Sequence, residues 1–125
     1  MSLSHKTKGQ LEAEISVAVT QFEKEHLGRG PREAKTFIIQ DMILIRLKGV
    51  LTPAEEKLAR EKGGAQLIKE MRLRLIESSR PLLEAILQEI TGLKCISLHT
   101  DISSRTGERV FVIVLSKDLE KVLAH

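Results

Sequence analysis

The sequence is poor in aromatic residues, with three phenylalanines and no tryptophan or tyrosine among 125 residues. Aliphatic side chains must therefore form most of the hydrophobic core. Proteins that bind single-stranded nucleic acid without sequence preference stack bases on exposed aromatic rings. The near absence of such rings argues against a base-stacking surface.

Cysteine and long apolar runs are scarce as well. Cys95 is the only cysteine, so no internal disulfide can form and nothing indicates an oxidising compartment. No run approaches the ~18 apolar residues of a membrane span, and residues 1–10 contain no apolar signal-peptide core. We expect a cytoplasmic protein without direct membrane insertion, which works at a membrane only if it is recruited there.

Neither sign of charge dominates. Twenty lysines and arginines oppose 17 aspartates and glutamates, a formal net charge of +3. This small excess permits weak attraction to polyanions without indicating it. With 42% hydrophobic and 30% charged residues, the composition indicates one folded domain over residues 1–125.

Two β-hairpins flank a long helical stretch. The first has only Gln40-Asp41 between its strands, which is hairpin loop length, and the second turns at residues 103–107. Residues 42–47 are nearly all apolar, so we expect a central strand buried on both faces, in which Arg46 needs a partner or a route to solvent. The predicted strands span residues 35–39, 42–47, 95–102 and 109–115.

Helix starts are marked by capping residues. Thr7 with Gln10, and Thr52 with Glu55, have capping-box spacing, and Ser116 is a candidate third cap. The predicted helices span residues 8–26, 53–62, 65–90 and 117–124. The order αββααββα predicts an α+β fold in which two hairpins form one sheet packed against a long kinked helix and an N-terminal helix.

Residues 65–90 keep a helical phase through Pro81, which favours one kinked helix over two helices that meet there. The predicted buried stripe is Ile68, Met71, Leu75, Ser79, Leu82, Ile86 and Ile90, joined by Leu67, Leu83 and Leu87. Arg72 is expected on a solvated, mixed-charge face. An unbroken helix of this length would span about 39 Å, so it must bend, protrude or pack against a second subunit. We therefore expect a homodimer.

Strand 95–102 offers the residues closest to a chemical site. Alternation places Cys95, His99 and Asp101 on one face, away from Ile96 and Leu98. His99 and Asp101 are too few for a metal site, and Cys95 and His99 lie about 13 Å apart, too far for a nucleophile and its base. We predict no catalytic residue, no metal ligand and no cofactor.

Two loops carry exposed charge next to glycine. Gly28-Arg29-Gly30 precedes a strand, so it indicates a helix end and turn rather than a phosphate-binding loop. Thr106 to Arg109 has the composition of a hairpin turn whose charged pair is available to a partner. The predicted partner or ligand surface comprises His99, Asp101, Arg105, Glu108, Arg109 and Arg29.

The order of elements also resembles that of bacterial-type KH domains, which clamp nucleotides with a Gly-x-x-Gly loop between two helices. Here that position reads Gly63-Gly64-Ala65-Gln66, without the second glycine of the motif. A nucleic-acid-binding module is thus an alternative that is not favoured. A small-ligand or metal-binding domain that uses His99 and Asp101 is a further alternative.

Five segments of the chain combine in a recognisable order. They are Thr7-Lys8-Gly9-Gln10, Gly28-Arg29-Gly30-Pro31, the run from Arg46 to Glu55, the run from Ser97 to Ser103, and the run from Thr106 to Arg109. Together these segments resemble the MpsC-like family of small bacterial proteins. The likeness spans residues 7–119. It implies a link with a sodium-translocating, membrane-potential-generating system connected with bicarbonate uptake. It further implies a non-enzymatic accessory or regulatory protein whose partner is a membrane transporter component.

Overall fold

A computed structural model describes residues 6–124, so His5 and His125 lie outside the described residues. The helices and strands follow the predicted order, which confirms the α+β fold. They are α1 (Lys8–His26), β1 (Glu33–Ile39), β2 (Met42–Lys48), α2 (Pro53–Ala59), α3 (Gly64–Thr91), β3 (Cys95–Ile102), β4 (Arg109–Leu115) and α4 (Leu119–Leu123).

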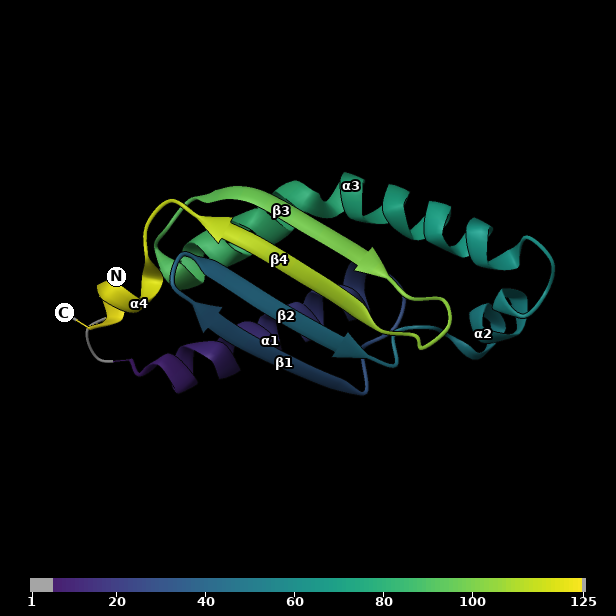
Figure 1. Cartoon of the computed structure of the whole chain (residues 1–125), viewed down its shortest axis with the longest axis horizontal. Helices are drawn as coiled ribbons and strands as arrows, with labels where there is room; N and C mark the ends of the chain where they lie inside the picture. Colours follow the sequence, from purple (N-terminus) through teal and green to yellow (C-terminus); the bar gives the residue numbers. More distant parts are fainter. Residues whose placement is uncertain (1–5, 125) are drawn as a thin grey trace.

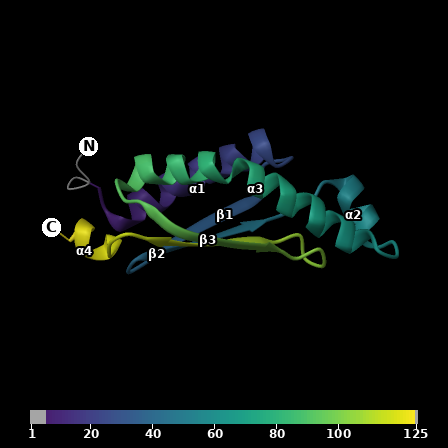
Figure 2. The ribbon, with the colours of Figure 1, turned by 90° about the horizontal axis from the view of Figure 1, so that it is seen from above.

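The four strands form one antiparallel sheet in the order β1-β2-β4-β3. Both long helices, α1 and α3, lie on the same side of this sheet (Figure 2). Viewed from the other side, all four strands are in front of the helices (Figure 1). One face of the sheet is thus covered and the other is open.

The core lies between the sheet and the two long helices. Leu11, Ile15 and Val19 of α1 are fully buried, as are Ile43 of β2 and Ile113 of β4. Helix α1 enters this layer through the predicted capping box, in which Gln10 N–H donates to Thr7 Oγ1 over 3.1 Å. Aliphatic packing between two layers therefore stabilises the fold, as the composition predicted.

The prediction that residues 42–47 are buried on both faces is wrong, although β2 is a central strand. Ile43, Ile45 and Leu47 are fully buried, whereas Leu44 on the opposite face is only partly buried. Both helices pack against the same face, so every second residue of the strand points away from the core.

Helix α3 is a single helix that continues through Pro81, which excludes the alternative of two helices. It bends along its length, and its first half extends beyond the sheet beside α2 (Figures 1 and 2). The predicted phase of its buried stripe is wrong in part, because Met71 and Leu82 are 45% and 43% exposed. Ile68 is buried as predicted, and Arg72 and Ile76, which the predicted stripe left out, are buried with it.

Several predicted boundaries are displaced. Strand β1 begins two residues earlier than predicted, α2 ends at Ala59 instead of Lys62, and α4 begins at Leu119 with Asp118, not Ser116, as its cap. Asp118 takes this role because its carboxylate accepts the Lys121 N–H over 3.1 Å.

A β-bulge changes the faces of β3. The pairing with β4 shifts between Cys95 and Ser97, so one strand has an extra residue there. Ile96 is therefore 65% exposed instead of facing the core, while Cys95 packs against the core and does not share the face of His99. From Leu98 onward the predicted alternation is confirmed, with Leu98 and Ile102 buried.

Candidate functional site

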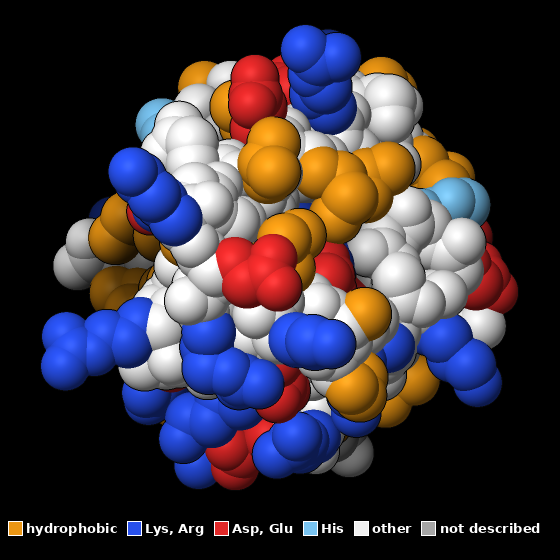
Figure 3. Space-filling model, turned by 90° about the vertical axis from the view of Figure 1, so that its right-hand side faces the viewer, with side chains coloured by type: hydrophobic (Ala, Val, Ile, Leu, Met, Phe, Trp, Pro, Cys, Tyr) orange, Lys and Arg blue, Asp and Glu red, His pale blue; other side chains and the backbone are white. Residues whose placement is uncertain are grey.

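A hollow of about 860 Å³ lies at the end of the molecule where α2 meets the ends of the strands. Its charged residues, which define the basic hollow, are Arg32, Lys48, Arg60, Arg105, Glu33 and Glu56. In Figure 3, which faces this end of the molecule, Lys and Arg side chains gather over the lower part, below a group of hydrophobic side chains. Four cations against two carboxylates give the basic hollow a net positive charge, which favours an anionic group.

Two loops build the walls of the basic hollow. Val50 N–H donates to the carbonyl of Gly107 over 3.0 Å, which ties the β2–α2 loop to the β3–β4 turn. Gly49 has φ +71°, and a Cβ atom there would lie 2.8 Å from Arg32 Cγ. Glycine at this position lets the backbone turn and lets the Arg32 side chain lie directly against it.

A buried arginine lies close to these loops and holds them in place through hydrogen bonds. Arg72 is 1% exposed, and its guanidinium donates to Glu55 over 2.6 and 3.0 Å. It also donates to the carbonyls of Leu27 over 2.5 Å and Val50 over 2.9 Å. One side chain of α3 therefore fixes the end of α1, the β2–α2 loop and the start of α2.

Within the hollow, two cations already have partners. Arg32 lies 3.9 Å from a Glu56 carboxylate oxygen, and Lys48 lies 3.4 Å from Glu33. Neither Arg60 nor Arg105 has a carboxylate at ion-pair distance within residues 6–124. These two exposed guanidiniums are therefore the groups best placed to bind a carboxylate or phosphate.

A second buried ion pair lies between α1 and β4. Glu23 and Arg109 are 0% and 2% exposed, and Arg109 Nε lies 3.8 Å from a Glu23 carboxylate oxygen. Both Glu23 oxygens lack a hydrogen-bond partner within residues 6–124. Burial raises the pKa of Glu23, an effect that the positive charges of Arg109 and Arg72 only partly oppose.

The predicted surface residues do not form one site. Arg105 lines the basic hollow, and Arg29 reaches its wall by donating to the Leu51 carbonyl over 3.4 Å. Arg109, expected to be exposed beside Glu108, is buried against Glu23, because alternate residues of β4 face opposite sides of the sheet.

The other three predicted residues lie on the open side of the sheet or at its edge. Glu108 accepts a hydrogen bond from Arg46 Nε over 2.9 Å, which supplies the partner that Arg46 was expected to need. The His99 ring nitrogen lies 3.2 Å from Ser97 Oγ. Asp101 accepts the N–H of the next residue over 2.8 Å and lies 3.6 Å from Lys69 Nζ.

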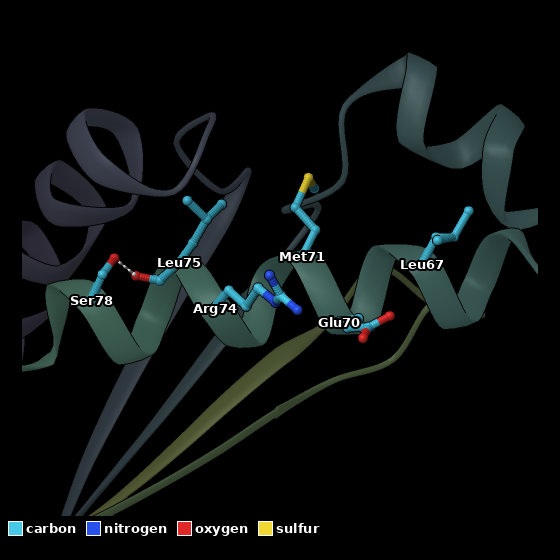
Figure 4. Close-up of a pocket in the computed structure, with 6 residues that line it drawn as sticks. All are labelled: Leu67, Glu70, Met71, Arg74, Leu75 and Ser78. Atoms are coloured by element: carbon cyan, nitrogen blue, oxygen red, sulfur yellow. Dashed lines mark hydrogen bonds between the residues drawn. The ribbon is translucent and has the colours of Figure 1, made fainter.

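Helix α3 carries a separate, open apolar groove of about 540 Å³. Leu67, Met71 and Leu75 project from one side of the helix, and Glu70 and Arg74 lie in front of them (Figure 4). No buried polar group points into this groove from its lining residues. Its lining indicates apolar contact rather than chemistry.

The thiol of Cys95 is not activated as a nucleophile. Burial and the nearby Glu84 carboxylate raise the pKa of the Cys95 thiol to about 11, so the thiol stays protonated at neutral pH. Among residues 6–124, no three His, Cys, Asp or Glu side chains are grouped so that they could hold a metal ion. No helix in the described part of the chain has the length and apolar character needed to cross a membrane.

The glycine pair between α2 and α3 is explained by packing. A Cβ atom at Gly64 would lie 1.7 Å from the Leu58 carbonyl oxygen, and Gly63 has φ +76°. These glycines allow two helices to meet in a tight turn. The resemblance to a nucleotide-clamping loop therefore has a structural explanation at both positions.

Sequence reasoning missed Arg72 and Glu23. Arg72 was assigned to a solvated face of the helix, and Glu23 was not considered. Charged side chains are rarely fully buried without partners, so neither was expected in the core. The signal for Arg72 was available, since it lies at helical spacing between Ile68 and Ile76. The partner of Glu23 depends on tertiary contacts that periodicity does not encode.

Fold and site together define a small α+β protein with one open sheet face and a basic hollow built from loops. The chain belongs to the family described as "Na+-translocating membrane potential-generating system (MpsC)", whose sequence model matches residues 7–117. This membership links the chain with a sodium and membrane-potential system at the level of the family.

Two relatives come from Bacillus subtilis (strain 168). The uncharacterized protein YbcI is 52% identical over 118 residues, which cover 94% of this chain and 95% of YbcI. The uncharacterized protein YrhF is 26% identical over 110 residues, 86% of this chain and 89% of YrhF. No solved structure matches the chain.

Proposed function

We propose that this protein is a non-enzymatic accessory or regulatory protein of a sodium-translocating, membrane-potential-generating system. In this proposal it acts from the cytoplasm and is recruited to the membrane by a protein component of that system. The observation that carries the proposal is family membership, because the family description names such a system.

The basic hollow supports binding of an acidic segment of the membrane component. Arg60 and Arg105 are exposed, and each can form paired hydrogen bonds with a carboxylate. The hollow is also open enough, at about 860 Å³, to admit several side chains of a partner. An acidic cytoplasmic loop or tail is the partner chemistry that this site fits.

The side chains that chemistry would need support a non-enzymatic role. The half-buried Cys95 thiol is protonated at neutral pH, and the contact given for the exposed His99 ring is with Ser97 and not with a carboxylate. Asp101 binds a backbone N–H and Lys69 instead. A nucleophile, its base and an orienting group are therefore not assembled among these residues.

The test compares membranes with and without the proposed partner. The tagged protein is incubated with solubilised membranes from cells that contain the membrane subunits of this system and from matched cells that lack them. We expect recovery of the subunits with the protein, and sedimentation of the protein only with the first membranes. Equal sedimentation with both would contradict the proposal.

Nucleic-acid binding is a second candidate, because a basic hollow also fits a phosphate backbone. Titration of labelled single-stranded RNA at about 150 mM salt tests it, since phosphate contacts give affinity that falls steeply with added salt. Binding that is lost on reversing the charge of Arg60 and Arg105 would favour this candidate over an acidic protein segment.

A further inference from the structure

The side chains that point away from α1 and α3 form the outer sheet face, and its centre is apolar. No helix in the described part of the chain crosses this face, which is turned toward the viewer in Figure 1. Phe37 and Ile39 are 44% and 42% exposed there. The apolar members of the outer sheet face are Phe37, Ile39, Met42, Leu44, Val110, Val112 and Val114.

Strand register arranges these side chains in continuous rows. Phe37 pairs with Leu44, Leu44 with Val112, and Val112 with His99. In a parallel row, Ile39 pairs with Met42, Met42 with Val114, and Val114 with Ser97. The apolar surface is therefore contiguous across three strands, unlike the groove on α3, which charged residues flank.

Charges at one end of the outer sheet face are divided between its two halves. The half formed by β1 and β2 carries Lys35, Arg46 and Lys48, with Glu33 as its acid. The half formed by β4 and β3, together with the residue that precedes β4, carries Glu108 and Asp101. A net positive half thus lies beside a negative half.

We propose that the outer sheet face is the interface of a homodimer, in which two copies stack face to face about a twofold axis parallel to the strands. This operation places β1 over β3 of the partner subunit and β2 over its β4. Lys35 then faces the partner's Asp101, and Leu44 faces the partner's Val112. A twofold axis across the strands would instead place the charged end of each copy over the apolar Ile39 end of the other, which leaves those charges without partners.

A second copy fits this face better than pairing at a sheet edge, because side chains occupy both edges. At β1, the Ile38 N–H donates to a Glu12 carboxylate over 2.8 Å. At β3, Arg80 donates to the Leu98 carbonyl, and Asp101 accepts the Ile102 N–H over 2.8 Å. Such contacts block extension of the sheet by another strand.

The area of the outer sheet face lies near the lower limit for a specific dimer interface. Four strands of seven residues cover about 19 by 23 Å, so two faces bury roughly 900 Å² before the side chains at the rim are counted. A specific interface requires about 1,000 Å² in total. The inference is independent of the proposed membrane partner, because Arg60 and Arg105 lie outside this face.

Light scattering over a concentration series up to about 0.1 mM tests the interface. The wild type should approach twice the 14.0 kDa chain mass. Phe37→Glu should remain at the chain mass, because it places a charge in the apolar row. Leu67→Glu, a matched change on α3 where Leu67 is 58% exposed, should still dimerise. A monomeric wild type, or a Phe37→Glu dimer, would overturn the proposal.

A charge exchange tests the orientation. Lys35→Asp and Asp101→Lys should each weaken dimerisation at least tenfold, since each places like charges opposite one another at two symmetric positions. The double variant Lys35→Asp/Asp101→Lys should restore dimerisation to within about threefold of wild type. Additive weakening in the double variant, with circular dichroism unchanged, would show that these residues do not face each other.

Discussion

Arg72 is the residue on which most of the site's geometry depends. Its guanidinium binds Glu55 and two backbone carbonyls, and its side chain is 1% exposed. Arg72→Met keeps the apolar length but leaves these acceptors without a partner. We expect the free energy of unfolding to fall by about 3–5 kcal/mol, the usual cost of breaking a buried ion pair.

Urea denaturation measures this loss, and Arg74→Met is the matched control. Arg74 is exposed and lies two residues further along α3. Its replacement should change the free energy of unfolding by no more than about 0.5 kcal/mol. Equal losses of unfolding free energy from the two substitutions would mean that only the positive charge on α3 matters, and that the buried hydrogen bonds of Arg72 do not.

Glu23, which is buried, and Glu55, which is partly buried, should affect stability in opposite ways as pH changes. Burial raises the pKa of Glu23 above its ordinary value of 4.5. Between 4.5 and the raised pKa, the folded protein holds a proton that the unfolded chain has released, so the contribution of Glu23 to stability falls as pH rises. We expect the stability of wild type relative to Glu23→Gln to decrease from pH 4.5 upward.

Glu55 supplies the contrasting case. Burial raises its pKa, but hydrogen bonds from Arg72 and Thr52 outweigh burial and lower the pKa below 4.5. The contribution of Glu55 to the stability of the folded protein is therefore complete above pH 4.5, and it is lost as pH falls through the lowered pKa. Urea denaturation of wild type, Glu23→Gln and Glu55→Gln at a series of pH values below and above 4.5 gives the free energy of unfolding as a function of pH, which measures both trends. Parallel curves for all three would contradict the assignment.

At the scale of elements, the turn between α2 and α3 depends on two glycines for different reasons. Gly64→Ala would place a Cβ atom 1.7 Å from the Leu58 carbonyl oxygen, so the two helices would have to separate. We expect a loss of about 2–3 kcal/mol, at the upper end of overpacking costs. Gly63→Ala meets no atom within 4 Å and should cost only about 1 kcal/mol, for its positive φ.

Thermal or chemical denaturation of both variants separates these effects. The order of the two losses is the informative result, because a loop that served only to clamp a ligand would tolerate both changes in the absence of that ligand. A Gly64→Ala variant as stable as wild type would rule out the tight turn between the helices.

Elements were predictable from sequence where local signals determine them. Capping boxes at Thr7 and Thr52 give the starts of α1 and α2, and the Gln40-Asp41 turn gives the first hairpin. The phase of the first half of α3 and the face of Ile96 were predicted incorrectly. The first depends on the buried Arg72, and the second on a β-bulge. In both cases a tertiary contact overrides the local pattern.

At the scale of the whole molecule, the site was less predictable than the fold. The basic hollow combines residues of the β1 start, the β2 end, α2 and the β3–β4 turn, which only tertiary folding brings together. Arg105 was identified because it lies in a charged turn. Arg60 was missed, because a charged residue at the end of a helix is usually solvated and does not by itself indicate a site. Arg109 was misplaced for a similar reason, since strand alternation depends on which face the helices cover.

Charge reversal in the basic hollow tests whether this assembled surface binds the membrane partner. Arg60→Glu/Arg105→Glu changes the net charge by four units without touching a buried residue. We expect at least a tenfold loss of recovery with partner-containing membranes, because an acidic segment would then meet like charge. The control Lys24→Glu/Lys117→Glu makes the same change in net charge at exposed positions that do not line the hollow.

This comparison distinguishes a local site from general electrostatic attraction. If the hollow is the binding site, the control protein keeps wild-type recovery and its binding weakens as salt is added, because the contacts are ionic. Similar losses in both double variants would mean that net charge, not the hollow, carries the binding. Light scattering on the same proteins provides the second readout. The outer sheet face is unchanged in both variants, so each should dimerise as wild type does.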